Sequence, residues 1–243
     1  MEIIGGTGKN YSEFEILKRA GGWYECCKNI QGIRLSPLVG YTAIDEQGRQ
    51  FVGEEYVNFA KIEENINIVQ DLASLLKSKI PINLLTKCDI FCGISEGGKT
   101  LATMLALVCG KKFKYPEKKI APLKKQGERD ESVFTFDTHK IMPHSEVIIV
   151  EDVMSTFSSI EKIFEELDKN KVFVSAIFTF FNCLNIGVSD YYDNLYRDDW
   201  STPIVSLVHK KIKHYSQNDQ FVAEDVKKGN VIWDPKREWH KLV

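Results

Sequence analysis

Hydrophobic positions along the chain form two patterns: short apolar runs, and longer stretches in which apolar residues recur every three or four positions. The runs are short enough for buried strands and lie at 88–92, 147–150, 172–181 and 204–208. The helical spacing predicts helices at 59–78, 99–109 and 158–167. Because strands and helices alternate and the strands are apolar throughout, we expect an α/β fold with a mainly parallel sheet flanked by helices.

The two ends of the chain depart from this alternation. Residues 1–58 are rich in Gly and Tyr and contain only short strand-like pieces, at 38–41 and 50–52. Residues 211–243 contain one predicted helix and end in a stretch with two tryptophans. We therefore expect an α/β core at 59–210, with an N-terminal segment at 1–58 and a C-terminal extension at 211–243 that packs on the core.

The composition is that of an ordinary folded protein. The 243 residues are 43% hydrophobic and 27% charged, close to the globular average. The longest apolar stretches, 101–109 and 172–181, are much shorter than the roughly 18–20 residues that a membrane span needs. The net charge of −2 argues against a broad surface for nucleic acid or anionic membrane, so we expect neither as a partner.

The N-terminus and the cysteines bear on the compartment. Residues Met1 to Gly6 do not place a basic region ahead of an apolar run, so the N-terminus does not resemble a signal peptide. Six cysteines are too few for a disulfide scaffold at this length. The sequence contains no C-x-x-C pair, so a zinc site is not expected. We therefore expect a cytoplasmic protein with buried, reduced thiols.

The segment after the first apolar run matches a phosphate-binding pattern. Residues 93–100 read Gly-Ile-Ser-Glu-Gly-Gly-Lys-Thr, which fits G-x-x-x-x-G-K-T between a predicted strand and a predicted helix. In a P-loop, backbone amides and the helix N-terminus hold phosphates, Lys99 would add charge and Thr100 would reach Mg²⁺. On this hypothesis, residues 147–152 supply the second metal-binding strand of a nucleotide hydrolase or kinase.

A second polar segment follows the apolar run at 147–150. Glu151 and Asp152 lead into Val-Met-Ser-Thr-Phe-Ser-Ser at 153–159, directly before a predicted helix. A helix-capping turn would account for the serines. It does not account for two adjacent carboxylates at the end of an apolar strand, where unpaired charge is costly. The acidic pair therefore indicates a functional site.

This second segment resembles the ribose-phosphate signature of the type I phosphoribosyltransferases, in which an apolar strand ends in two acidic residues followed by a Thr/Gly/Ser turn. Residues 93–102, Gly-Ile-Ser-Glu-Gly-Gly-Lys-Thr-Leu-Ala, resemble the pyrophosphate-binding turn of orotate phosphoribosyltransferases, where Gly-x-x-x-Gly-Gly-x-x-Leu-Ala is typical. Residues 115–119 are similar to the strand that leads into their mobile basic loop, and residues 50–60 to the segment that lines their base pocket. The resemblance spans roughly residues 50–180.

The resemblance implies an enzyme that transfers ribose 5-phosphate between phosphoribosyl pyrophosphate and a nucleobase. The enzyme type it implies is the orotate phosphoribosyltransferase of pyrimidine nucleotide synthesis, with orotate as the base. It also implies a homodimer, and Mg²⁺ held mainly by the substrate with Asp152 as the protein's ligand. The residues it assigns to catalysis are Glu151, Asp152, Lys118 and Lys119. It assigns the 5′-phosphate to Met154, Ser155, Thr156, Phe157, Ser158 and Ser159, pyrophosphate to Ile94, Ser95, Glu96 and Gly97, and the base to Tyr56, Val57 and Asn58.

Each group has a chemical role in this interpretation. The two carboxylates accept hydrogen bonds from the ribose hydroxyls and favour positive charge on the sugar. The loop at 118–132, with Lys118, Lys119, Lys124 and Lys125, is expected to be mobile without ligand and to close over bound substrate, which excludes water.

One turn departs from the family pattern. The usual string is close to Thr-Thr-Gly-Gly-Ser, whereas residues 155–159 read Ser-Thr-Phe-Ser-Ser. Phe157 lies three positions before Ile160 and seven before Phe164, so we expect its ring on the buried face of the helix and its backbone at an ordinary angle. Two other hypotheses remain open at this point: a P-loop nucleotide hydrolase or kinase that uses 93–100, and a protein with the phosphoribosyltransferase fold that binds nucleotide without catalysis.

Overall fold

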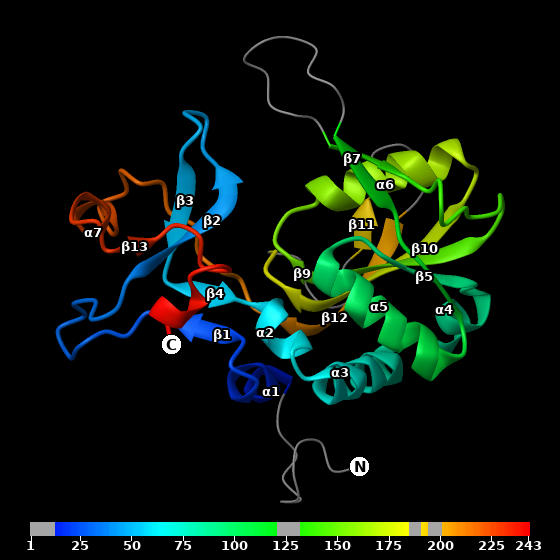
Figure 1. Ribbon diagram of the computed structural model, residues 1–243, viewed down its shortest axis with the longest axis horizontal. Helices are drawn as coiled ribbons and strands as arrows, with labels where there is room; N and C mark the ends of the chain where they lie inside the picture. Colours follow the sequence, from blue (N-terminus) through cyan, green and yellow to red (C-terminus); the bar gives the residue numbers. More distant parts are fainter. Residues whose placement is uncertain (1–12, 121–131, 185–190, 194–200) are drawn as a thin grey trace, which may run out of the picture. The chain divides into compact units, whose positions relative to one another are not determined.

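The chain folds into two compact units. The structure, a computed structural model, describes residues 13–120, 132–184, 191–193 and 201–243. The first unit comprises the described residues within Asn65–Lys210, and the second comprises those within Gly8–Glu64 and Lys211–Val243. Figure 1 shows the elements of both units, coloured from blue at the N-terminus to red at the C-terminus. No helix in these described ranges is long and apolar enough to cross a membrane.

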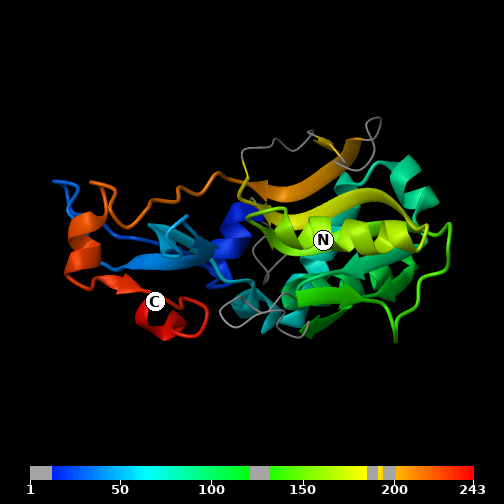
Figure 2. The same cartoon turned by 90° about the horizontal axis from the view of Figure 1, so that it is seen from above.

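Six strands form the central sheet of the first unit: β5 (Ile90–Gly93), β6 (Lys112–Lys114), β9 (Glu146–Met154), β10 (Phe173–Asn182), β11 (Tyr191–Asp193) and β12 (Ser201–His209). Their order is β11-β12-β10-β9-β5-β6. All neighbours are parallel except β11, which is antiparallel to β12 at one edge. In Figure 2 the orange strand β12 runs beside β10. The expected mainly parallel sheet is therefore confirmed.

Helices cover both faces of this sheet. Helix α5 (Glu96–Cys109) packs on β5 and β9 and against α3 (Ile66–Lys79). Helix α6 (Ser158–Lys169) shares a hydrophobic core with β9 and β10. Figure 1 shows α6 on one side of the sheet and α3 and α5 on the other. Helix α4 (Ile82–Lys87), which the sequence pattern did not predict, follows α3 and contacts β10.

Capping residues explain why two helices differ from the sequence prediction. The helix expected at 59–78 is two helices, α2 (Phe59–Glu63) and α3, because Asn65 leaves helical geometry and caps α3 with its side chain. Helix α5 begins three residues earlier than expected. The reason is that the Ser95 hydroxyl accepts a hydrogen bond from the amide of Gly98, which stabilises the first turn.

The two ends of the loop predicted at 118–132 form a small β-hairpin. Strand β7 (Glu117–Ile120) pairs antiparallel with β8 (Ser132–Thr135). Phe134 and Phe136 join the core on the α6 side of the sheet, which anchors the hairpin. The prediction of a loop over 118–132 is therefore wrong at both ends, which are hydrogen-bonded strands, whereas its mobility without ligand stays a prediction. Residues 121–131 lie outside the described residues.

The second unit joins the two ends of the chain. Strand β2 (Leu38–Ile44) pairs antiparallel with β3 (Gln50–Gly53) and parallel with β13 (Val231–Ile232), and these strands surround a small core. The other elements of this unit are α1 (Glu13–Arg19), β1 (Trp23–Glu25), β4 (Glu55–Val57), α2, α7 (Ala223–Lys227) and a short 3₁₀ helix at Trp239–Lys241. Strands β1 and β4 form a separate antiparallel pair.

The sequence predicted three successive segments, 1–58, 59–210 and 211–243, whereas the structure groups the chain into two units. Residues 211–243 do not form an extension of their own but share a unit with the N-terminal segment, which ends at Glu64. Strand pairing between β13 and β2 is one cause. Arg34 is another, because it pairs with Glu54 at 2.6 Å and with Asp225 at 2.9 Å, so one guanidinium joins both ends of the chain.

None of the six cysteines is joined in a disulfide. Cys26, Cys88, Cys92 and Cys183 are buried, as expected, whereas Cys27 is exposed. Burial raises the pKa of the Cys92 thiol to about 12, so this group is inert as a nucleophile at neutral pH.

Candidate functional site

The two polar segments identified from the sequence lie at one edge of the central sheet. The carboxyl ends of β5 and β9 are neighbours, since Gly93 is paired with Val150. Each strand is followed by a short turn that leads into a helix, α5 after β5 and α6 after β9. Ligands of parallel α/β proteins bind at this edge, beyond the carboxyl ends of the strands.

The first segment is a two-residue turn and not a P-loop. Helix α5 starts at Glu96, so the Gly-Gly-Lys of the pattern lies inside the helix. The amide of Ile94 donates a hydrogen bond to the carbonyl of Val150 at 3.2 Å. A P-loop presents a run of loop amides to the phosphates, and residues 93–100, all of them described, form no such run. The P-loop hypothesis is therefore wrong for this chain.

The four residues assigned to pyrophosphate have different surroundings. The Ile94 amide is already engaged, and the Ser95 side chain caps α5. Glu96 and Gly97 occupy the first two helical positions, where amides have no acceptor within the helix. An anion at this helix N-terminus would meet those two amides and the positive end of the helix dipole. The binding of pyrophosphate there stays a prediction.

Two glycines let α5 approach the sheet closely. A Cβ on Gly98 would lie 2.7 Å from the carbonyl oxygen of Val150 and 2.6 Å from the Ser95 hydroxyl oxygen. A Cβ on Gly93 would lie 2.5 Å from the Cα of Lys99. Only glycine fits at such distances, because any side chain would force the helix away from the strands. The glycine-rich string thus serves close packing of the helix start against the sheet edge.

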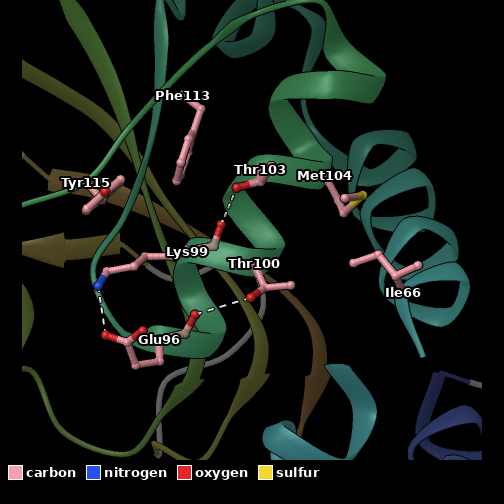
Figure 3. Close-up of a pocket in the computed structure, with 8 residues that line it drawn as sticks. All are labelled: Ile66, Glu96, Lys99, Thr100, Thr103, Met104, Phe113 and Tyr115. Atoms are coloured by element: carbon pink, nitrogen blue, oxygen red, sulfur yellow. Dashed lines mark hydrogen bonds and ion pairs between the residues drawn. The ribbon is translucent and has the colours of Figure 1, made fainter. Parts of the chain in front are cut away.

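Lys99 lies on the outer side of α5. Its ammonium pairs with Glu96 at 2.7 Å and lies 5.0 Å from the centre of the Tyr115 ring. Figure 3 shows these side chains around a hollow of about 430 Å³, which Phe113 and Thr100 also line. Neither residue of the acidic pair lines this hollow. The hydroxyl of Thr100 donates to the carbonyl of Glu96 at 3.4 Å, so it too serves the helix.

The acidic pair lies inside β9, which continues to Met154 and past the predicted strand end. The Ser95 hydroxyl donates a hydrogen bond to Asp152 Oδ1 at 2.6 Å. Burial, and then repulsion from the Asp152 carboxylate, raise the pKa of Glu151 to about 8, while the Ser95 hydroxyl opposes this rise. Within the described residues, no salt bridge neutralises either carboxylate. The pair can therefore offer oxygens to a ligand.

A row of polar side chains crosses the sheet beside Glu151. Thr179 on β10 is paired with Glu151, and Ser206 on β12 is paired with Thr179, so the three share one face of the sheet. Thr179 is fully buried and its hydroxyl donates to the carbonyl of Asp152 at 3.2 Å. The Ser206 hydroxyl is buried without a partner among the described residues. This row could not be predicted from the sequence, because strand register is not encoded within any one segment.

The turn after β9 comprises residues 155–157, and Phe157 behaves as predicted. Its backbone has φ −88° and ψ −5°, which any residue adopts, and its ring packs against the core on the α6 side. Phe157 is the N-cap residue of α6 and makes no side-chain cap. The capping-turn interpretation of the serines is therefore wrong, because Ser158 and Ser159 lie inside the helix.

The other residues assigned to the 5′-phosphate divide into two groups. Met154 is buried in the core at the end of β9, so only its backbone faces the turn. Ser155 and Thr156 are exposed, and the hydroxyls of Thr156 and Ser158 lie 3.1 Å apart. With the first-turn amides of α6, these hydroxyls provide donors at a helix N-terminus. Phosphate binding by this turn stays a prediction.

The two described lysines of the predicted basic loop lie on β7. Lys119 forms an ion pair with Asp137, and this hydrogen-bonded carboxylate raises the pKa of the lysine. Lys118 is exposed and is paired in the hairpin with Phe134. Lys124 and Lys125 lie outside the described residues. A catalytic role for Lys118 and Lys119 stays a prediction.

The residues assigned to the base pocket belong to the second unit. Val57 and Asn58 are buried there. The Tyr56 ring lies against Tyr41 and Trp239, with centres 6.5 and 6.2 Å apart. These contacts hold β4 in place within its unit, and a role toward a base stays a prediction.

The part of the chain that the structure describes does not build a complete metal site. Among the described residues, no three or more His, Cys, Asp or Glu side chains gather at a point that could hold a metal ion. The Asp152 carboxylate is the kind of hard oxygen donor that Mg²⁺ prefers, and Ser95 takes one of its two oxygens. Asp152 could therefore supply one ligand to such an ion, and the binding of Mg²⁺ stays a prediction.

Comparison by sequence finds no relative. No protein-family model matches the chain, and a search of curated proteins finds no significant match.

Comparison by structure finds clear matches. The orotate phosphoribosyltransferase of Aeropyrum pernix matches with a TM-score of 0.53 and 22% identity, over 80% of this chain and 92% of that one. An adenine phosphoribosyltransferase of Trypanosoma brucei matches with a TM-score of 0.52 and 14% identity, over 80% and 79%. The UMP synthase of Leishmania donovani matches with a TM-score of 0.51 and 12% identity, over 93% of this chain and 40% of that one. The chain therefore has the type I phosphoribosyltransferase fold.

Proposed function

We propose that this protein is a phosphoribosyltransferase, which transfers ribose 5-phosphate between phosphoribosyl pyrophosphate and a nitrogen of a nucleobase. One observation carries the proposal: at the carboxyl edge of the sheet, the partly buried pair Glu151 and Asp152 adjoins two helix starts. Asp152 is hydrogen-bonded to Ser95, the N-cap of α5, and the turn at 155–157 leads from β9 into α6. Two helix N-termini flanking two carboxylates suit a ligand that carries phosphates at both ends and hydroxyls between them.

The reaction needs positive charge to be tolerated on the sugar while pyrophosphate leaves. Asp152 would accept hydrogen bonds from the ribose hydroxyls and stabilise that positive charge electrostatically. Glu151 would add to this stabilisation in its ionised form, which its raised pKa of about 8 makes the minor form at pH 7. The first-turn amides of α6 would hold the 5′-phosphate, and those of Glu96 and Gly97 would hold pyrophosphate. Mg²⁺, held mainly by substrate oxygens with Asp152 as the protein ligand, would neutralise charge on the leaving group.

We propose orotate as the base and a homodimer as the active form. The support for orotate is the string at 93–102, which resembles that of the orotate enzymes. Structural neighbours include both an orotate and an adenine enzyme. The assay therefore offers orotate, adenine and further bases in parallel, with Mg²⁺ and phosphoribosyl pyrophosphate.

Replacing Asp152 by Asn tests the proposal. We expect turnover to fall at least ~100-fold, because removing one preorganised electrostatic partner typically costs about 10²–10³. Asp168→Asn, at an exposed position near the far end of α6, serves as the matched control and should leave turnover unchanged. Urea denaturation verifies that both variants fold.

The outcomes separate the remaining hypotheses. Near-normal turnover in Asp152→Asn contradicts the proposal. Calorimetric binding of phosphoribosyl pyrophosphate and a nucleoside monophosphate, without turnover of any base, favours a non-catalytic nucleotide-binding protein instead. If folded protein with Mg²⁺ binds neither compound, the turn at 155–157 does not hold a phosphate.

A further inference from the structure

We propose that the Ser95 hydroxyl is a positioning group, which fixes the Asp152 carboxylate relative to the N-terminus of α5. The proposal rests on the proposed function, because it concerns how that site holds a sugar and a phosphate at a set separation. Ser95 would act through Asp152 and not by reacting itself.

The hydroxyl is held on two sides. It accepts a hydrogen bond from the Gly98 amide at 2.9 Å and donates one to Asp152 Oδ1 at 2.6 Å. A serine hydroxyl has a single proton, and the 2.6 Å separation assigns that proton to Asp152, although the same hydroxyl also lies close enough to Glu151 to lower the pKa of that group. The 2.6 Å separation is in the range of a charge-assisted O–H···O⁻ bond, which is stronger than a neutral one. Among the described residues no hydrogen bond engages the second side-chain oxygen of Asp152, so it can face a ligand.

The capping role of Ser95 does not explain this second bond. Capping requires only that the side-chain oxygen accept from an amide of the first turn. Asn65, which caps α3, does that and no more: it accepts from the Asn67 amide at 3.2 Å. Ser95 adds a donation to a residue 57 positions away in the sequence. Among the caps of the described helices, this one therefore couples a helix start to the acidic pair.

The backbone around Ser95 makes the coupling stiff. The Ile94 amide donates to the Val150 carbonyl at 3.2 Å, directly before the acidic pair. Gly98 brings the first turn of α5 so close that a Cβ there would clash with both Val150 and Ser95. Displacement of the helix start would therefore displace the carboxylate, and misplacement of a positioned group by about 1 Å can cost about 10²-fold in rate.

Two substitutions separate positioning from capping. Glycine is tolerated at an N-cap nearly as well as serine, so Ser95→Gly removes the donor while largely keeping the helix start. Ser95→Thr keeps a hydroxyl that can both cap and donate. Asn65→Gly loses a cap on α3 in the same way and serves as the matched control.

We expect Ser95→Gly to lower kcat/KM for phosphoribosyl pyrophosphate about 10- to 100-fold, and Ser95→Thr to restore most of that loss. Asn65→Gly should leave kcat/KM within about twofold of the unmodified protein, because the loss of a cap alone does not reach the site. The double variant Ser95→Gly/Asp152→Asn should be no slower than Asp152→Asn, since a group that acts through Asp152 has nothing left to position.

Full activity in Ser95→Gly, or a loss that multiplies with that of Asp152→Asn, would overturn the inference while leaving the proposed function intact. If Asp152→Asn is itself fully active, the proposed function fails. The coupling between Ser95 and Asp152 is then tested by urea denaturation of four proteins: the unmodified protein, Ser95→Gly, Asp152→Asn and the double variant. Non-additive shifts in the urea midpoint then support the Ser95–Asp152 coupling, and additive shifts overturn it.

Discussion

Glu151 lies in a strand of otherwise mostly apolar residues, and its environment makes the folding of the chain depend on pH. Its pKa rises from an ordinary value of 4.5 to about 8 in the folded protein, chiefly through burial. Between these two pH values the folded protein holds a proton that the unfolded chain releases. The free energy of unfolding therefore falls as the pH rises from about 4.5 to about 8.

Glu151→Gln should remove this dependence. We expect the variant to be more stable than the unmodified protein by at least about 1 kcal/mol at pH 8, and of similar stability at pH 4.5, because one unit of pKa shift corresponds to about 1.4 kcal/mol. Urea denaturation at both pH values measures the difference. Glu46→Gln, in an exposed turn, is the control. An equal stability difference at both pH values would contradict the prediction.

Under the proposed function the same substitution should lower turnover most above about pH 8, where Glu151 is ionised and contributes its charge to the site. Glu151 would then lower the stability of the fold at neutral pH while serving the site, which is a trade-off between stability and activity.

At the scale of elements, the joint between α5 and β9 depends on the absence of a side chain. Gly98 lies in the first turn of α5, where alanine would normally favour the helix by about 1 kcal/mol. The close approach of the Val150 carbonyl reverses that preference, because a new Cβ would overlap it.

Gly98→Ala should therefore destabilise the protein by about 1–3 kcal/mol, as overpacking does. It should also weaken the bond between Ser95 and Asp152, because the helix start must shift. Thermal or urea unfolding measures the loss, and Thr100→Ala, on the outer side of the same helix, should stay within about 0.5 kcal/mol. A Gly98→Ala protein as stable as its parent would mean that α5 can move without cost.

At the scale of the whole molecule, the second unit is assembled from segments at opposite ends of the chain. Arg34 has a side chain only 14% exposed and bridges Glu54 to Asp225. Lys28 also pairs with Glu54, but it is more exposed and reaches no residue of the C-terminal segment through any ion pair within the described residues. Lys28 can therefore serve as the control for Arg34, because both pair with Glu54 but only Arg34 also pairs with Asp225.

Arg34→Met should lower the stability of the second unit by about 1–3 kcal/mol, because it leaves two partly buried carboxylates without their shared partner. Lys28→Met should cost less than about 1 kcal/mol, as exposed ion pairs do. Hydrogen exchange should speed up together in peptides from 13–64 and 211–243 of the Arg34→Met protein, with 65–184 unchanged. Faster exchange in the N-terminal peptides alone would show that Arg34 does not hold the C-terminal segment.

Local sequence patterns were sufficient for the core and for the location of the acidic pair. Continuous apolar runs predict buried strands because both faces of a parallel sheet are covered, so the runs at 147–150 and 172–181 needed no partner to be recognised. Glu151 and Asp152 were recognised because charge at the end of such a run is costly unless it has a use. The ordinary backbone angle of Phe157 followed from helical spacing alone.

Contacts between distant segments decided the rest. The residues that make α5 begin at Glu96 are local, but the reason that Gly98 must be glycine lies on β9. The Ser95–Asp152 bond, the register of Thr179 beside Glu151 and the union of β13 with β2 each join residues far apart in the chain. No periodicity or spacing within one segment encodes such pairings, because they depend on which surfaces meet when the whole chain is packed.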